Sequence, residues 1–343
     1  FMQKIDQLVS EALRPSEREL YESRLRAANL WGRSAAKEAA KLRSTLDRLA
    51  AMPRPKVTSI GSRTLGAKVA AAAIMQASDW HVEEIVEPGS IAGYRNKYNP
   101  KIAKARAEAF FSVGQRLIDV MAQDLIVEAI VLPLLGDFIT NELHEESVEN
   151  NAMTPMEAIV FAQDLLASGI NMLLERNPKR HILVVCHSGN HGRVTKRVHH
   201  AKEHGHSLEY LMYINLAKMF KSQNKIAFRI PLGYQSWTSI YGVDVRMHHG
   251  HMVQFHGGVG GITIPVNKAV AQWDKARQAG LDLFGHFHTL LDGRKWAANG
   301  SLIGYNAYAV AIKAEPEPPA QWFHMIDSKR GRTWRNPIYV QES

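Results

Sequence analysis

HILVVCHSGNH, residues 181–191, contains the local pattern from which the architecture can be predicted. An apolar run of strand length, Ile182–Val185, passes directly into a polar cluster, His187–His191. Short apolar runs that end in turn-forming residues are typical of buried strands. This stretch therefore predicts a strand that ends in a polar turn.

The same pattern occurs twice upstream. Val69–Met75 leads into the cluster Ala77–His81, and Ile126–Leu135 leads into Gly136-Asp137. Each run is short and is followed by residues that favour a turn. We therefore expect three strands of this kind before residue 192.

The segments between these strands have helical periodicity. Apolar residues recur every three or four positions in Ile102–Gln123 and Pro155–Glu175, and Thr154 is expected to cap the second helix. Strands that alternate with helices predict an α/β fold. Toward the C-terminus the helices become sparse, and further strands are expected at Val243–Met247, Met252–Phe255, Leu281–Phe284, Tyr305–Ile312 and Trp322–Ile326.

The N-terminal region has a different sequence pattern. From Lys4 to about Met52 it is helical, with a helix start predicted at Pro15-Ser16-Glu17, and Pro53 and Pro55 then break the pattern. We expect an N-terminal helical extension over residues 1–56 and a larger α/β domain over residues 57–343. The basic residues of the extension are interpreted as a solvated face, with nucleic-acid binding as the alternative.

Composition narrows the class of protein. The 343 residues include 42 Lys and Arg against 33 Asp and Glu, a formal net charge of +9. The one cysteine, Cys186, allows no intramolecular disulfide and is expected to be a buried, reduced thiol. No uninterrupted apolar stretch reaches the roughly 18 residues of a membrane span, and no apolar signal segment is evident. We expect a cytoplasmic protein without a membrane partner.

Each predicted strand end carries residues that can bind a metal ion. Functional side chains gather at the carboxyl ends of strands in α/β folds. Oxygen and nitrogen ligands without a thiolate suit manganese, iron or zinc, and an Asp between two cations can bridge them in a hydrolytic site. Any one of these residues alone is more simply a structural or surface residue. The set is Asp79 and His81, Asp137, Asn190 and His191, His249 and His251, and His286 and His288.

These residues form a recognisable series. It resembles, in the same order, the five-block signature of the calcineurin-like metallophosphoesterases. The resemblance covers Val69 to about Ile326 and implies a four-layer sandwich of two mixed β-sheets flanked by helices. The motifs are Asp79-Trp80-His81, Gly136-Asp137, Gly189-Asn190-His191, His249-Gly250-His251 and Gly285-His286-Phe287-His288.

The resemblance also implies a role for each motif residue. One metal ion would be held by Asp79, His81 and His288, and the other by Asn190, His249 and His286, with Asp137 bridging both. His191 would face the substrate phosphate and donate a proton to the leaving oxygen or stabilise developing charge. Two divalent ions are implied; manganese (Mn2+) is expected, with Fe2+, Zn2+ and Ni2+ as alternatives.

Three residues near the motifs leave alternatives open. The family usually has an acid after Gly-Asn-His, whereas Gly192 and Arg193 follow here, so the group that orients His191 is not identified. Arg193 is predicted either to hold a phosphate oxygen or to begin a basic helix. His251 is assigned to substrate binding, with a supporting or surface position as the alternative.

Basic clusters favour a polyanionic substrate. We predict a metal-dependent phosphodiesterase, most similar to the nuclease branch that includes SbcD-type DNA repair exonucleases, in a phage or prophage version, with DNA as substrate. The alternatives are a small-nucleotide phosphodiesterase or phosphatase, and a non-catalytic nucleic-acid-binding protein. The sequence is compatible with either a monomer or a homodimer. Nucleases of this family commonly pair with an ATPase, but no residues here indicate a surface that would bind one. The clusters are Arg95, Lys97, Lys101, Lys104 and Arg106; Arg193, Lys196, Arg197 and Lys202; and Lys329, Arg330 and Arg332, with Trp334 after them.

Overall fold

The computed structural model describes residues 15–51, 68–91, 93–143, 145–255, 260–311 and 314–341. Contacts divide the chain into two units, Phe1–Thr64 and Leu65–Ser343. The predicted boundary between residues 56 and 57 lies outside the described residues. The first unit contributes helix α2 (Pro15–Ala51), which begins at the predicted start, Pro15.

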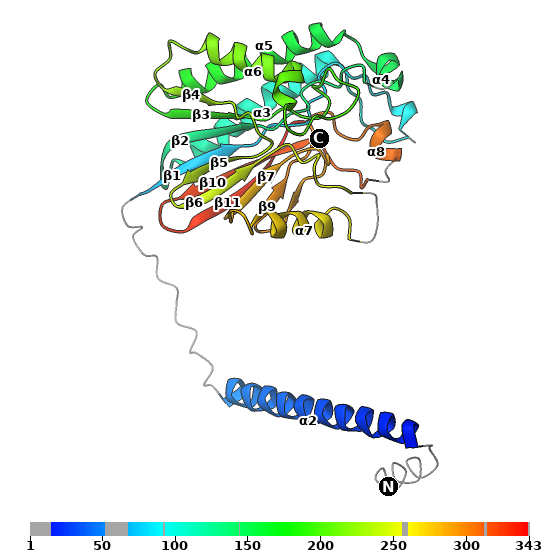
Figure 1. Cartoon of the computed structure of the whole chain (residues 1–343). Coiled ribbons are helices and arrows are strands. Elements are labelled where there is room, and N and C mark those ends of the chain that lie inside the picture. The colour runs from blue at the N-terminus through cyan, green and yellow to red at the C-terminus, as the bar shows by residue number, and fades with distance from the viewer. Residues whose placement is uncertain are drawn as a thin grey trace. The chain divides into compact units, whose positions relative to one another are not determined.

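The second unit contains two mixed β-sheets (Figure 1). In the first sheet β1 to β4 are parallel, and β10 and β11 add an antiparallel hairpin beside β1. Its strands in spatial order are β11 (Gly331–Tyr339), β10 (Ala320–Asp327), β1 (Val69–Met75), β2 (Leu125–Leu134), β3 (His181–Cys186) and β4 (Ile226–Arg229).

The second sheet combines a parallel centre with antiparallel edges. Strands β6, β7 and β9 are parallel, and β5 and β8 pair antiparallel with β6 and β9. In spatial order the strands are β5 (Ser236–Ile240), β6 (Val243–Met247), β7 (Leu281–Phe284), β9 (Trp296–Ala298) and β8 (Leu291–Asp292).

Helices cover the outer faces of the two sheets. Figure 1 shows α5 and α6 on the side of the first sheet and α7 on the side of the second. Thr154 caps α5 as predicted, in a reciprocal capping box with Glu157. The helices of this unit are α3 (Pro100–Met121), α4 (Glu145–Asn150), α5 (Pro155–Arg176), α6 (Leu208–Met219), α7 (Thr263–Trp273) and α8 (Ala307–Ala311), with short 3-10 turns η1 (Pro88–Ser90) and η2 (Glu203–His206).

Three separate hydrophobic clusters define the layers. One lies between the first sheet and helices α3, α5 and α6, a second lies between the two sheets, and the third joins the second sheet to α7. Since each sheet is apolar on both faces, four layers are needed to bury them. This confirms the predicted α/β sandwich of two mixed sheets flanked by helices.

One helix of the described chain, α5, is long and apolar enough by composition to cross a membrane. Its apolar window is 44% buried, and Ala158, Leu166 and Ile170 belong to the cluster over the first sheet. The hydropathy of α5 is therefore accounted for by its position in the core.

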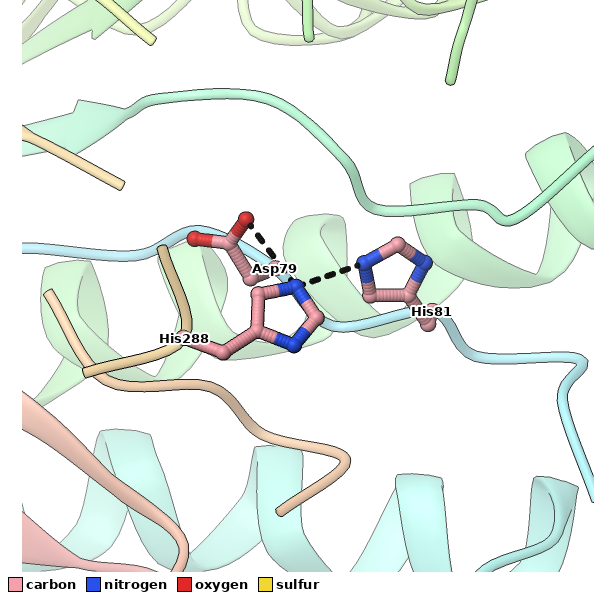
Figure 2. A group of neighbouring side chains, drawn as sticks. All are labelled: Asp79, His81 and His288. Atoms are coloured by element: carbon pink, nitrogen blue, oxygen red, sulfur yellow. Dashed lines mark hydrogen bonds and ion pairs between the residues drawn. The ribbon is translucent and has the colours of Figure 1, made fainter. Parts of the chain in front are cut away.

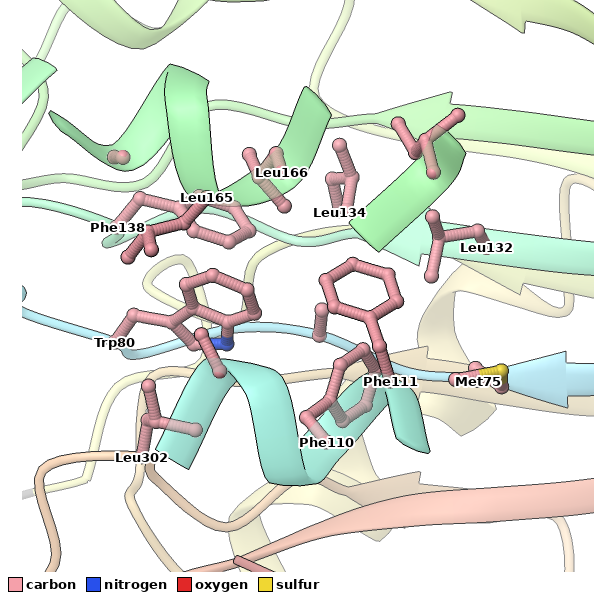
Figure 3. Packing of buried hydrophobic residues seen from close by; sticks show 14 of the residues in the cluster. Met75, Trp80, Phe110, Phe111, Leu132, Leu134, Phe138, Leu165, Leu166 and Leu302 are labelled. Carbon is pink, nitrogen blue, oxygen red and sulfur yellow. The ribbon is translucent and has the colours of Figure 1, made fainter. Parts of the chain in front are cut away.

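Trp80 connects the first core to the strand-end loops. It is fully buried, and its ring packs edge-on against Phe138 and Phe110, with centroids 5.0 and 6.0 Å apart (Figure 3). The hydroxyl of Tyr98 donates to the Trp80 carbonyl at 2.6 Å. Because Trp80 lies between Asp79 and His81, burial of the indole fixes the position of both neighbours.

Two strand predictions are wrong. Tyr305–Ile312 contains helix α8, because Asn306 accepts a hydrogen bond from the backbone N–H of Ala309 and starts a helical turn. Met252–Phe255 forms no strand; the Val253 N–H instead closes a turn onto the Gly250 carbonyl. Apolar runs of this length are ambiguous between strand, helix and buried loop.

Candidate metal centre

Residues from distant motifs meet in two groups that are able to hold metal ions. Asp79, His81 and His288 form one, and Asp137, His249 and His286 form the other. In each group one ligand atom per residue lies within 4.8 Å of the others. Figure 2 shows the first group, in which the carboxylate and one nitrogen of each imidazole converge.

The two groups adjoin, and Asn190, the seventh predicted ligand, lies beside the second. The backbone N–H of His286 donates to both carboxylate oxygens of Asp79 at 3.0 Å, which links the groups. Nε2 of His249 lies 2.9 Å from Oδ2 of Asp137 and 3.2 Å from Oδ1 of Asn190. All seven residues that the sequence suggested as ligands therefore lie in one place.

Backbone strain is concentrated in these residues. Asp79, His81, Asp137, His286 and His288 all have positive φ, between 48° and 72°. Left-handed backbone is uncommon for residues other than glycine, and such strain clusters at functional sites because the surrounding structure holds it in place. Five of the seven proposed ligands share this unfavourable conformation, which a purely structural loop would not need.

Asp79 is held by a buried polar network that sequence patterns did not reveal. The hydroxyl of Ser78 donates to Oδ2 of Asp79 and accepts from Nδ2 of Asn299 at 3.0 Å. Gln321, on β10, accepts from the Ser78 N–H at 3.0 Å and from Asn299 at 3.1 Å. Gln321 has no motif around it, so only the pairing of β10 with β1 identifies it.

Asp137 depends on the close approach of two turns. A Cβ on Gly189 would lie 2.1 Å from Oδ1 of Asp137, and one on Gly136 would lie 2.2 Å from the Gly189 nitrogen. Gly136 also has a φ of +88°. No side chain fits at either glycine. The backbone N–H of His191 then reaches Oδ1 of Asp137 at 2.8 Å.

Glu209 is a supporting residue that sequence analysis missed. It is completely buried, and its two oxygens accept from the backbone N–H groups of Phe138 at 2.6 Å and Gly189 at 2.7 Å. These bonds tie together the turns that follow β2 and β3. Burial, reinforced by the negative charge of Asp137, raises the pKa of Glu209 to about 8.

Hydrogen bonds at Nδ1 orient the imidazoles. Nδ1 of His249 donates to the Leu135 carbonyl at 2.6 Å, and Nδ1 of His81 lies 3.0 Å from the Thr140 hydroxyl. In each ring Nε2 then faces the other ligand atoms of its own group, the first for His81 and the second for His249. Partners of this kind fix the tautomer of metal-binding histidines.

The donor set fits divalent cations. Nε2 of His81 and Nε2 of His288 face each other at 3.2 Å, an arrangement in which at most one can donate. Burial and the neighbouring His249 lower the pKa of His286 to about 3, which leaves it neutral and able to coordinate. Burial opposes charge on His249 as well, but Asp137 outweighs it and raises the pKa of His249 to about 10. Carboxylate, amide oxygen and imidazole suit manganese, iron or zinc.

His191 lies beside the two groups, and its orientation has a clear cause. Its Nδ1 is 2.9 Å from the Thr140 carbonyl oxygen, and its ring centroid is 5.1 Å from that of His81. Asn141 donates to the carbonyls of His191 and Arg193 at 2.9 and 2.8 Å and holds this loop. A backbone carbonyl thus takes the place of the acid that the sequence lacks after Asn190-His191.

Arg193 and His251 lie near the second group. Arg193 begins no helix, since residues 193–202 are irregular, and its guanidinium donates to the Asn190 carbonyl. His251 is not a surface residue: its side chain is 5% exposed, and its Nε2 lies 3.5 Å from Oε1 of Glu203. Burial raises the pKa of Glu203, another residue that sequence analysis missed, to about 7.

Comparison with known proteins gives weak likenesses. No protein-family model and no curated protein matches the chain. Among solved structures, an archaeal phosphodiesterase is 10% identical over 78% of this chain and 99% of that chain (TM-score 0.35). Vps29 of Entamoeba histolytica with zinc is 13% identical over 49% and 89% (TM-score 0.26), and a hypothetical protein of Pyrococcus horikoshii is 11% identical over 79% and 89% (TM-score 0.37). Function is therefore inferred from the geometry of the site itself.

Replacement of Asp137 by Asn tests the bridging position. We expect Asp137→Asn to weaken manganese binding by at least 10- to 100-fold, because a charged oxygen that faces His249 is lost. Isothermal titration calorimetry and elemental analysis of bound metal measure this directly. Asp164→Asn, on the exposed face of α5, removes the same charge and should bind like the unmodified protein. Retention of two tightly bound ions by Asp137→Asn would contradict the assignment.

Glu209 allows a matched test of the link between the two turns. Glu209→Ala leaves two buried N–H groups without acceptors and should lower the free energy of unfolding by about 2–4 kcal/mol. Glu209→Gln keeps one acceptor oxygen, so its free energy of unfolding should fall by roughly half as much. Urea denaturation in the presence of a chelator separates this effect from metal binding. Equal stability of Glu209→Ala and the unmodified protein would show that the link is unimportant.

Proposed function

We propose that this protein is a metallophosphoesterase that hydrolyses phosphodiester bonds with a pair of divalent cations. The observation that carries the proposal is the meeting of seven ligand-type side chains from five separate segments in two adjoining groups, with His191 beside them. When bound, a cation pair offsets the negative charge of a phosphate and lowers the pKa of a water molecule.

Asp137 and His191 would position the reacting groups and transfer the proton. Asp137 lies in the second group, and its Oδ1 accepts from the His191 N–H, so it couples the metal groups to the proton donor. Because Nδ1–H of His191 donates to the Thr140 carbonyl, the exchangeable proton is carried at Nε2. From Nε2 the proton would pass to the leaving oxygen of the ester.

A nucleic-acid substrate is the finer part of the proposal. The net charge of +9 favours polyanions, and Arg193 lies beside Asn190. Arg106 does not contribute to that attraction: its side chain is buried and holds the carbonyls of Leu302 and Ile303. We retain a cytoplasmic DNA nuclease that uses manganese, of the SbcD-like branch, as the first activity to test.

A small-nucleotide ester is the second candidate, and one specific feature favours it. A hollow of about 20 Å³ beside His288 is lined by Phe287, Tyr305 and Tyr308. It is too small to enclose a nucleobase, so a base would stack on the exposed faces of these rings instead. Glu315 and Glu317 line the same hollow and would repel a second phosphate. The aromatic and acidic residues around this hollow together favour a single nucleotide over a long strand.

A substrate panel decides between the two candidates. The protein is incubated with manganese and with single-stranded DNA, duplex DNA, RNA, bis-nitrophenyl phosphate and nitrophenyl phosphate. We expect hydrolysis of the bis-ester and of at least one polymer, and none after chelation. Hydrolysis of the bis-ester without any polymer would favour the small-nucleotide ester over the nuclease. Cleavage of the monoester alone would overturn the diester proposal, and no hydrolysis at all would overturn the enzyme proposal.

Substitution of His191 separates proton transfer from metal binding. We expect His191→Ala to retain both metal ions and to lower kcat by about 10² to 10⁴, because the group that protonates the leaving oxygen is removed. The loss should be smaller for nitrophenolate, a leaving group that needs little protonation, than for DNA. His181→Ala, at the exposed start of β3, is the control. Loss of metal from His191→Ala would assign the residue a different role.

A further inference from the structure

An open cleft of about 830 Å³ lies at the opposite end of the sandwich from the candidate metal centre. It is lined by Gly242–Asp244, where β6 begins, and by Ala279–Leu281, where β7 begins. The metal groups instead follow the ends of these strands, at His249 and His286. Extended chain rises about 3.3 Å per residue, so Val243 and His249 are roughly 20 Å apart.

The third wall of the cleft is the hairpin between β10 and β11. Asp327, at the end of β10, pairs with Ala71 near the start of β1, so the hairpin turn also lies at the amino ends of the parallel strands. The basic cluster around Arg330 therefore does not flank the metal centre, as a steering role at that site would require. It belongs to a separate surface.

The cleft carries an excess of positive charge. Four arginines line it: Arg294, Arg330, Arg332 and Arg335. The acids are Asp244 in the lining and Asp292 behind it, which pairs with Arg332 and Arg335 at 3.1 Å. A third acid, Asp327, accepts from the Arg330 backbone N–H at 2.7 Å, so four positive charges against three negative charges leave a net charge of +1 (4 − 3).

Two of these arginines are held through their backbone N–H groups, Arg294 by Asp292 and Arg330 by Asp327. Within the described part of the chain, no carboxylate pairs with the guanidinium of Arg294 or Arg330, and both residues are exposed. Arg294 has a left-handed backbone, with φ of 68°, because Oδ1 of Asp292 accepts from its backbone N–H at 2.7 Å. Nη1 of Arg332 is buried without a hydrogen-bond partner. Donors held in this way suit the oxygens of a phosphate.

An aromatic side chain completes the surface. Trp334, on β11, lines the cleft and is 48% exposed. Arginines that contact phosphates, interleaved with an exposed aromatic ring on which a base can stack, are the means by which proteins bind unpaired strands. We propose that this cleft binds single-stranded nucleic acid, with Arg294 and Arg330 on the phosphates and Trp334 against a base.

This inference does not depend on the proposed hydrolysis. Binding at the cleft needs no metal, so it can be measured in a chelator, where no strand is cut. A strand held at one end of the sandwich would be retained while another part of it approached the metal centre. Absence of hydrolysis would leave the binding result standing.

Fluorescence anisotropy of a labelled 20-nucleotide oligothymidine, in EDTA and over 50–200 mM salt, tests the proposal. Arg294→Gln/Arg330→Gln should weaken binding at least tenfold at low salt. It should also reduce the slope of log K against log salt by about 1.4, at about 0.7 per lost phosphate contact on single strands. Trp334→Ala should weaken binding roughly tenfold with an unchanged slope.

The matched control is Lys218→Gln/Lys221→Gln, at the exposed end of α6, which removes the same two charges elsewhere. Circular dichroism melting of every variant checks that it is folded. Unchanged binding by the arginine variant, or an equal loss with the lysine control, would overturn the proposal. So would tighter binding of duplex DNA, or of phosphatidylserine vesicles, with the same dependence on Arg294 and Arg330.

Discussion

The close approach of the turn after β2 to the turn after β3 is the contact on which the candidate metal centre depends. Gly136 and Gly189 leave no space for a side chain between the turns. The carboxyl group of Glu209 accepts from the backbone N–H of Phe138 in the first turn and from that of Gly189 in the second. Since β2 and β3 are parallel neighbours in register, their ends reach this contact without any long loop. Asp137 and Asn190 are thereby placed beside each other.

Electrostatics makes this arrangement suited to a cation. Asp79 and Asp137 are almost completely buried, and a buried carboxylate is costly unless it is paired. Burial alone would raise the pKa of Asp137, but the charge of His249 outweighs it and holds the pKa well below its usual range. Imidazole nitrogens that face one another, as in His81 and His288, gain little from hydrogen bonding alone. Cations between these groups would satisfy both kinds of donor at once.

The two ends of the sandwich have different chemical characters. The end that carries the metal groups combines imidazoles, carboxylates and a small aromatic hollow, whereas the other end is an open arginine-rich cleft. Parallel strands β6 and β7 run directly from one end to the other. Because both sheets are fixed by three buried clusters, the separation between the ends is rigid. A nucleic acid bound in the cleft, as proposed, would have to span this separation to reach the metal groups.

Local sequence was sufficient for the strands that lead into the site, β1, β2, β3, β6 and β7, and for the residues at their ends. It did not predict β4, β5, β8, β9 or β11. Apolar runs such as Val69–Met75 and Leu281–Phe284 have the lengths of the observed strands, and the polar residues after them lie in the site. These predictions succeed because a strand and its following turn depend on neighbours along the chain. Two apolar runs of strand length were misleading, because Asn306 caps the helical turn of α8 and the Val253 N–H closes a turn onto the Gly250 carbonyl.

Contacts between distant segments account for what local sequence could not predict. Gln321 reaches Ser78 only because β10 lies against β1, and Glu209 reaches Gly189 only because α6 packs behind the loops. The arginine cleft likewise exists only where the β10–β11 hairpin meets the starts of β6 and β7. A side chain's nearest neighbours across a fold are set by sheet order and layer packing, and neither leaves a periodic signal in a single sequence.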